Sequence, residues 1–219
     1  MSVLVLVLAG KRELPPRRPL DNRVSRYDRN SVNASFRQRL FDALEESIAE
    51  DGYPKTTIAD VVRRARTSRR TFYEHFTSKD ECFVALLAEA NAEQVRQITA
   101  AVDPDAPWDT QVRQAIEAWI ASVESRPALM LSWIRDVPAL AMTARLLQRD
   151  AMDNFITMVQ ALTHSEGFRS AGPVSRQRII MLLGGLRELT AITVEDGGRM
   201  SDITEEAVAA AIALVDPRH

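Results

Sequence analysis

The chain has 219 residues, which is enough to bury a core in one large domain or in a small domain joined to a larger one. Apolar residues make up 46% of the sequence and charged residues 26%, a composition that is typical of a soluble globular protein and excludes a bundle of membrane-spanning helices. Cys82 is the single cysteine, so an intramolecular disulfide is excluded and a zinc site with the usual Cys and His ligands is not expected. We therefore predict a cytoplasmic protein with no metal site, no other cofactor and no membrane partner.

The net charge of −2 conceals an uneven distribution along the chain. Between Lys11 and Glu81 there are 16 basic and 12 acidic residues, a balance of +4, so the rest of the chain carries −6. A mildly basic N-terminal third beside an acidic remainder favours a DNA-reading head on a body that does not touch DNA.

Residues 1–32 are expected to lie outside the folded core. Val3–Ala9 has the length and apolarity of a signal-peptide core, but no basic residue precedes it and Lys11 and Arg12 follow it, so a cleaved signal is not expected. Residues 11–30 hold three prolines and seven basic side chains, a composition that predicts a disordered or extended, solvated tail. The alternative is a basic arm that contacts DNA phosphates or enters a minor groove.

The first predicted helix begins at Ser35, because Ser35 and Gln38 have the spacing of a capping box and apolar residues follow at helical intervals. It ends at Asp51-Gly52, since a glycine is the usual residue just past a helix end. Pro54 prevents its continuation, because the residue before a proline avoids helical angles.

Two short helices are predicted next, one from Thr57 to about Ala65 and one from about Ser68 to His75. Thr57 has an acidic residue, Asp60, at the position that completes a capping box. Two short helices joined by a tight turn and braced by a longer one form the helix-turn-helix, which lays its second helix in the major groove.

Beyond Ser78 the pattern is helical, and the interruptions fall at prolines and glycines. No segment shows strand periodicity. We expect an all-α protein of about nine helices, in which a helix-turn-helix DNA-binding domain at 33–82 precedes a larger helical ligand-binding and dimerisation domain at 83–219. The remaining helices are predicted at roughly 78–101, 107–124, 127–135, 138–163, 174–196 and 203–215.

The second helix of the predicted helix-turn-helix has the residue types that DNA reading needs. Phe72 and Phe76 are four residues apart and can anchor one face in a core, which leaves arginine and hydroxyl side chains on the other. Arginine forks match guanine edges, and hydroxyl groups bind phosphates or bases. Lys79 lies at the start of the next helix, where backbone amides already favour a phosphate. The alternative is that the arginines form only a solvated face.

This stretch resembles the DNA-binding signature of the TetR/AcrR family, the tetracycline-repressor-like transcriptional regulators. The resemblance spans roughly Ser35 to Leu86, and its most specific part is the Tyr-x-x-Phe-x-x-Lys spacing that ends at Lys79. It rests on Asp51-Gly52-Tyr53, Thr56-Thr57-Ile58, Ala65, Ser68, Thr71-Phe72-Tyr73-Glu74-His75-Phe76 and Ser78-Lys79-Asp80.

The resemblance implies that Arg69, Arg70 and Thr71 face the bases. It implies backbone contacts for Thr57, Tyr73, His75 and Lys79. One departure is Arg66, which stands where the family usually has a glycine in the turn, so Arg66 either alters the turn or adds a phosphate contact. The predicted DNA-binding residues are Thr57, Arg66, Thr67, Ser68, Arg69, Arg70, Thr71, Tyr73, His75 and Lys79.

The helix at 174–196 is apolar on more than one face, so one face can pack inward while another meets a partner. A fully buried helix within the chain is the alternative. The family resemblance implies a homodimer built on a four-helix contact, and a twofold dimer reads two DNA half-sites about 34–36 Å apart. The predicted interface residues are Ile180, Leu183, Gly184, Arg187, Ala191, Ala207, Ala211 and Leu214.

Large and soft side chains lie between the head and this interface, and they either line an apolar cavity or fill a core. The resemblance implies a cavity for an effector, whose identity is unknown and for which the lining favours a hydrophobic or amphipathic molecule. The predicted lining is Trp108, Trp119, Met130, Trp133, Met142, Phe155 and Met158.

The histidines are limited to His75, His164 and His219, and the sequence contains no phosphate loop, dinucleotide fingerprint or nucleophile elbow. We therefore predict no catalytic residues and a ligand-responsive repressor that binds a palindromic operator in double-stranded DNA. The alternative is an all-α small-molecule-binding or catalytic protein in which the N-terminal helices are structural. Substitution of Arg69 and Arg70 separates the two, because only the repressor would lose DNA binding.

Overall fold

The computed structural model of this protein describes residues 22–140, 142–162 and 174–216. Its chain divides into two compact units, residues 1–36 and 37–219. The apolar run Val3–Ala9 and the proline-rich stretch up to residue 21 lie outside the described residues, as do His164 and His219.

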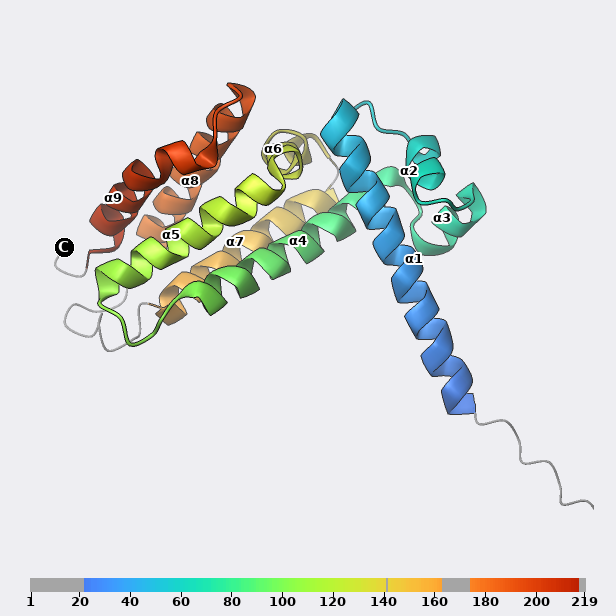
Figure 1. The fold of residues 1–219 in the computed structure, drawn as a ribbon, viewed down its shortest axis with the longest axis horizontal. Coiled ribbons are helices and arrows are strands. Elements are labelled where there is room, and N and C mark those ends of the chain that lie inside the picture. The colour runs from blue at the N-terminus through green and yellow to red at the C-terminus, as the bar shows by residue number, and fades with distance from the viewer. Residues whose placement is uncertain (1–21, 141, 163–173, 217–219) are drawn as a thin grey trace, which may run out of the picture. The chain divides into compact units, whose positions relative to one another are not determined.

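Every regular element in the described ranges is helical, which confirms the predicted all-α class (Figure 1). The α-helices are α1 (Asn22–Asp51), α2 (Ile58–Arg64), α3 (Arg69–His75), α4 (Lys79–Ala101), α5 (Trp108–Ser125), α6 (Pro127–Arg135), α7 (Met142–Leu162), α8 (Arg176–Glu195) and α9 (Thr204–Val215), and 3₁₀ turns lie at Val137–Ala139 and Met200–Ile203. None of the helices in these ranges is both long and apolar enough to cross a membrane.

The predicted start of the first helix at Ser35 was wrong, because α1 begins at Asn22 and Ser35 lies inside it. The expectation of an extended segment up to residue 32 was therefore wrong for residues 22–32. Residues 20–34 contain neither glycine nor proline, and once a helix is nucleated each further residue adds a hydrogen bond at little cost. The helix ends as predicted at Gly52, whose φ of +77° is left-handed.

The cap predicted at Thr57 is present, and Ser78 supplies a second cap further along the chain. The Thr57 hydroxyl accepts from the Asp60 amide, and the Asp60 carboxylate accepts from the Thr57 amide, which forms the full capping box of α2. The Ser78 hydroxyl caps α4 by accepting from the Glu81 amide at 3.1 Å. These local bonds fix where the short helices begin.

The first hydrophobic cluster holds the helix-turn-helix together. Phe72 and Phe76 of α3 are 0% and 2% exposed, as the four-residue spacing predicted. The ring of Phe76 lies 5.7 Å from the ring of Phe41 on α1 and 5.8 Å from the ring of Phe72. Such tilted aromatic pairs contribute roughly 0.5–1.5 kcal/mol beyond their buried area. The anchored face of α3 thereby fixes which side chains face outward.

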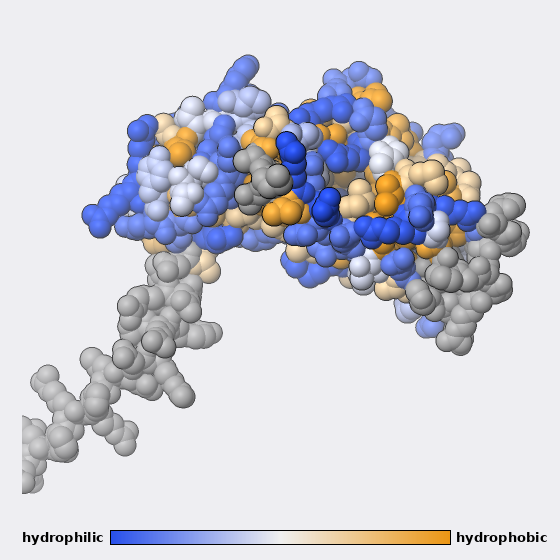
Figure 2. Space-filling view, turned by 180° about the vertical axis from the view of Figure 1, so that it is seen from behind, coloured by the Kyte–Doolittle hydropathy of each residue, from blue (hydrophilic) through white to orange (hydrophobic). Residues whose placement is uncertain are grey.

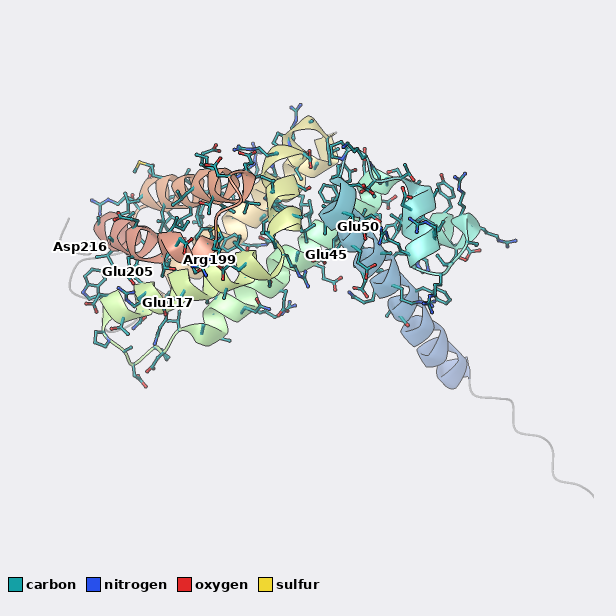
Figure 3. The ribbon with its side chains drawn as sticks, turned by 45° about the horizontal axis from the view of Figure 1, so that its top comes forward. Glu45, Glu50, Glu117, Arg199, Glu205 and Asp216 are labelled. Carbon is teal, nitrogen blue, oxygen red and sulfur yellow. The ribbon has the colours of Figure 1, made fainter. Side chains whose placement is uncertain are left out.

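A second cluster lies between α5, α8 and α9, which run alongside one another in Figure 1. Arg113 of α5 forms a bidentate ion pair with Glu205 of α9, at 2.8 and 2.9 Å (Figure 3). Helix α4 packs on both α5 and α7, so it connects the helix-turn-helix to this body. The predicted domain boundary between residues 82 and 83 falls inside α4.

Candidate functional site

The turn between α2 and α3 is a Schellman motif. The Thr67 amide donates to the Val62 carbonyl at 2.9 Å, and the Arg66 amide donates to the Arg63 carbonyl at 3.3 Å. Arg66 occupies the left-handed position of this motif, with φ of +49°. The backbone therefore makes the turn that a glycine would make there, although a left-handed residue with a side chain costs about 1–2 kcal/mol.

Beyond the turn, the outward face of α3 carries the predicted base-reading residues. Ser68 caps the helix by accepting from the Thr71 amide at 3.0 Å, so the first turn is fixed. Arg69 is exposed, and the Arg70 side chain is 89% exposed although it pairs with Glu74 at 3.2 Å. Tyr73 is 56% exposed, which is unusual for a large aromatic side chain. The exposed surface of α3 thus presents two cations and a tyrosine.

The five arginines between positions 63 and 70 have different surroundings. The Arg64 side chain is only 17% exposed and donates to the Glu50 carboxylate of α1 (Figure 3), with Glu46 at 3.8 Å. The hydrogen bond that Arg64 donates to Glu50 raises the pKa of Arg64. Arg64 thus fixes α2 against α1, while Arg63 is exposed beside Asp60 at 3.4 Å. Counting arginines in the sequence could not separate these roles.

Lys79 braces the loop before α2. Its Nζ donates to the carbonyl oxygens of Tyr53 and Thr56, both at 2.9 Å, and lies 4.1 Å from the centre of the Tyr53 ring. Burial lowers the pKa of the ammonium. The Tyr53 hydroxyl in turn donates to Asp80. Two of the three N–H donors of Lys79 are therefore bonded within the protein. Only the third is left for the predicted phosphate contact.

The other predicted DNA-binding residues lie close to the same surface. Thr57 is exposed, but its hydroxyl is bonded to the Asp60 carboxylate. Thr67 is half-buried in the turn. His75 ends α3, is half-buried, and has its ring 6.4 Å from that of Phe76. Their DNA contacts stay predictions.

The helical body contains two adjoining, partly open cavities. One, the polar chamber, has a volume of about 110 Å³ and is lined by apolar side chains together with Asn91, Gln94, Gln148, Arg187 and Thr190. The other, the dry chamber, has a volume of about 80 Å³ and exposes only apolar surface to its interior. The side chains that line both chambers and separate them are Trp119, Phe155, Leu183 and Leu186.

Five of the seven predicted lining residues belong to these walls. Trp119 and Phe155 line both chambers, Met130 and Trp133 line the polar chamber, and Met158 lines the dry one. The remaining two are not among the lining side chains that the structure describes. Trp108 packs partly buried against the second cluster, and the side chain of Met142 is outside the described part of the chain.

Sequence analysis missed the polar members of the polar chamber. Asn91 and Gln94 are each 7% exposed and lie three residues apart on α4, with Leu87 and Ile98 buried along the same helix. Two amides among buried apolar positions are the signal that could have found them, because uncharged polar residues are seldom so deeply buried. Arg187, predicted as an interface residue, lines this chamber and donates to the Ile134 carbonyl at 3.0 Å.

The outer face of α8 carries exposed apolar side chains: Ile180, Met181 and Ile192 are 41%, 57% and 47% exposed. Gly184 and Gly185 lie between them, and no atom comes within 4 Å of the place that a Cβ would take on either glycine, so a second backbone can approach there. Hydrophobic patches stand out among hydrophilic side chains on the rear face of the protein (Figure 2).

Three of the predicted interface residues are buried inside the chain. Ala191, Ala207 and Ala211 were wrong, because each is at most 1% exposed and packs inside the chain. Leu183 is half-buried in the chamber walls and Leu214 is half-buried against the second cluster. Ile180 and Gly184 remain on the outer face, and sequence analysis missed Met181 and Ile192.

Cys82 shows no sign of being a reactive thiol. It is fully buried at the start of α4, and burial raises its pKa to about 12. Since the thiolate is the nucleophilic form, a thiol of this kind is inert at neutral pH. In the described ranges there is also no group of three His, Cys, Asp or Glu side chains placed to hold a metal ion.

Helices α2 and α3 are joined by a tight turn and leave a cationic helix surface exposed, which is the geometry of a helix-turn-helix. Helix α4 joins this unit to the helical body that holds the two chambers. Residues 40–86 match the family model of the bacterial regulatory proteins of the tetR family. A Bacillus subtilis protein described as an uncharacterized HTH-type transcriptional regulator, YxbF, is 26% identical over 191 residues, which are 82% of this chain and 44% of the relative. The chain thus spans less than half the length of that relative.

Solved structures share the fold. The fatty acid degradation regulator FadR of Bacillus halodurans matches with a TM-score of 0.71 at 15% identity, over 81% of this chain and 94% of that one. FadR of Bacillus subtilis in complex with stearoyl-CoA matches with a TM-score of 0.70 at 14% identity, over 81% and 98% of the two chains. The resemblance that the sequence indicated is thus found for residues 40–86, and the solved structures extend the likeness in fold to about four fifths of the chain, 81% for FadR of Bacillus halodurans.

Proposed function

We propose that this protein is a cytoplasmic, ligand-responsive repressor that binds a palindromic DNA operator as a homodimer. The observation that carries the proposal is the outward face of α3, where Arg69, Arg70 and Tyr73 are exposed while Phe72 and Phe76 are buried. Guanidinium groups on an exposed helix can read guanine in the major groove, and a tyrosine hydroxyl can bind a phosphate.

A homodimer explains the outer face of α8. Met181 and Ile192 expose apolar surface that water solvates poorly, and the two neighbouring glycines leave room for a second backbone. The occupant we propose is a second copy of this chain in twofold contact, because such a pair places two α3 helices for two half-sites. The same geometry requires a palindromic operator.

Release by a small effector is supported by the two chambers beneath α4 and α8. The FadR of Bacillus subtilis, which shares the fold, was solved with stearoyl-CoA. Here α4 both carries Lys79 at the helix-turn-helix and contributes Asn91 and Gln94 to the polar chamber. A ligand that moves α4 would therefore shift α3 and change the spacing of the two DNA-reading helices.

Selection from random duplex DNA at two salt concentrations tests the proposal. We expect an enriched palindrome whose binding weakens steeply with salt, because phosphate contacts release counterions. The variant Arg69→Ala/Arg70→Ala should lose it, with about 1–3 kcal/mol lost for each base-reading arginine. The control Arg96→Ala/Arg199→Ala removes the same charge from exposed positions away from α3 and should retain it (Figure 3 labels Arg199).

The opposite result is equally informative. If no sequence is enriched at low salt, or if both double variants behave alike, α3 does not read DNA. The protein would then be a small-molecule-binding protein with structural N-terminal helices. A reporter gene placed behind the enriched palindrome separates repression from activation.

A further inference from the structure

The polar chamber holds hydrogen-bond donors that lack acceptors. The Nε2 atoms of Gln94 and Gln148 are inaccessible to solvent, and neither has a hydrogen-bond partner among the described residues. Gln94 is 93% buried as a residue, since only 7% of its surface is exposed. The two amides come from α4 and α7 and line the same cavity. A buried donor left unpaired is destabilising, so these two amides favour a ligand that supplies hydrogen-bond acceptors.

Arg187 adds a positive charge to the same cavity. Its Nη2 donates to the Ile134 carbonyl, and its guanidinium has no carboxylate partner among the described ion pairs. Burial lowers the pKa of this guanidinium, because partial removal from water disfavours its charged form. The nearest carboxylate that acts on it, Glu188, is bound by Arg135 at 3.0 and 3.1 Å.

The remaining polar groups do not supply the missing acceptor. The Thr190 hydroxyl donates to the Leu186 carbonyl at 2.8 Å within α8. In the dry chamber, the Gln111 amide donates to the carbonyls of Pro104 and Ala106, at 3.2 and 2.8 Å. The unmet donors are therefore concentrated on one side of the wall, and only apolar surface lies on the other.

We propose that the polar chamber binds the carboxylate of an amphipathic monocarboxylic acid, whose apolar body passes between Trp119 and Phe155 into the dry chamber. This inference rests on the proposed effector site and names the chemical class that the site recognises. A carboxylate has two acceptor oxygens with about four lone-pair positions, which suit one guanidinium and two amide donors. Its charge also compensates the half-buried cation of Arg187.

Size restricts the ligand. A cavity of about 150 Å³ is known to bind benzene; each chamber alone is smaller than that, and the two together are larger. The ligand must therefore occupy both chambers, and the shared wall must move to join them. A headgroup as large as a nucleotide does not fit the polar chamber, so the free acid is favoured over a coenzyme A thioester.

Calorimetric titration of the purified full chain with matched eight-carbon probes tests the class. We expect octanoate to bind at least tenfold more tightly than 1-octanol or octylamine, because only the carboxylate both accepts from the amides and compensates the cation. Phenylacetate, which carries the same group on an aromatic body, distinguishes an aliphatic from an aromatic source. Equal affinity for octanoate and octanol, or tighter binding of octanoyl-CoA than of octanoate, would overturn the proposal.

Substitutions in the polar chamber give a signature that a structural role would not give. We expect Gln94→Leu to weaken octanoate binding about tenfold or more while the melting temperature without ligand stays at or above that of the wild type, because an unpaired buried amide has been removed. Arg187→Met should weaken it at least as much. Gln177→Leu, on the exposed part of α8, is the matched control and should change neither quantity.

The contrary pattern has a clear meaning. If Gln94→Leu lowers the melting temperature and leaves the octanoate affinity unchanged, buried water satisfies the amides and the chamber is structural. Failure of octanoate to bind at millimolar concentration also overturns the inference, while DNA selection still decides the proposed function. Conversely, the protein could bind octanoate while no DNA sequence is enriched. That result would support the carboxylate site and contradict the proposal that the protein is a repressor.

Discussion

The ammonium of Lys79 donates to the carbonyl oxygen of Tyr53 and lies against the ring of the same residue. One side chain at the start of α4 thus fixes the loop that connects α1 to α2, and its second hydrogen bond, to Thr56, extends that loop contact. The helix-turn-helix therefore depends for its geometry on a residue that its family signature places at the DNA.

Lys79→Met should therefore destabilise the fold as well as affect DNA binding. Two half-buried carbonyl groups lose their charged donor, so we expect the free energy of unfolding to fall by about 1–3 kcal/mol. Urea denaturation followed by circular dichroism measures this. Lys55→Met removes the same charge from an exposed position and should change the free energy by less than about 0.5 kcal/mol. Equal effects of the two variants would show that the hydrogen bonds of Lys79 contribute nothing.

Arg66→Gly should stabilise the protein. Glycine adopts the left-handed conformation of Arg66 without steric cost, although it loses more backbone entropy on folding, so the net gain is up to about 1 kcal/mol. Arg66→Ala keeps the left-handed strain and should be no more stable than the wild type. Urea midpoints of the three proteins order them, and a glycine variant below the alanine variant would contradict the strained turn.

The same two variants test whether Arg66 contacts DNA. A phosphate contact predicts that both lose affinity for every sequence alike and that the slope of log affinity against log salt falls by about one. If only the stability changes, Arg66 is a tolerated substitute for glycine in the turn.

The helices of this fold could be predicted because their boundaries have local causes. Gly52 and Pro54 end α1, Thr57 caps α2, and Pro127 opens α6 at the first helical position. The buried face of α3 could also be predicted from the sequence, since Phe72 and Phe76 are four residues apart. In each case the deciding interaction is between residues that are near in the sequence.

The predictions failed in two situations. In one, the deciding contacts join residues that are far apart in the sequence. In the other, a helix is apolar on nearly every side, so its sequence does not show which side is buried. Helix α9 is apolar nearly all around, so its sequence could not tell that Ala207 and Ala211 face the core while Ala210 is exposed. The polar chamber combines Gln94, Gln148 and Arg187 from three helices, and such a meeting depends on how the helices pack. The outward face of α3 was therefore predictable from the sequence, and the polar lining of the chamber was not.

Arg135 should make the stability of the body depend on pH in the acid range. It donates to both Glu188 and Glu195 of α8, and these bonds hold the pKa of both carboxyls below their usual range. A folded pKa below the unfolded value means that the stabilisation is present above the unfolded pKa and is lost as pH falls through the folded pKa. We expect Arg135→Ala to lower the urea midpoint at neutral pH by an amount that shrinks toward zero in acid.

The control for this measurement is Arg145→Ala, an exposed arginine on α7. Its midpoint should differ from that of the wild type by the same small amount at every pH. Since the Arg135 pairs are exposed, added salt should also reduce their effect. A deficit of Arg135→Ala that persists below the pKa of both carboxyls would mean that packing of the side chain is responsible.

A charge introduced on the outer face of α8 tests the oligomeric state of the protein. Met181→Lys introduces an ammonium that a twofold contact would bury without a partner, which costs about 2 kcal/mol or more and weakens dimerisation at least about thirtyfold. Leu146→Lys, at a similarly exposed apolar position on α7, is the matched control and should remain dimeric. Sedimentation velocity over a concentration series measures both. A Met181→Lys protein that sediments as the wild type does would place the interface elsewhere, and the two DNA half-sites would then need another source of symmetry.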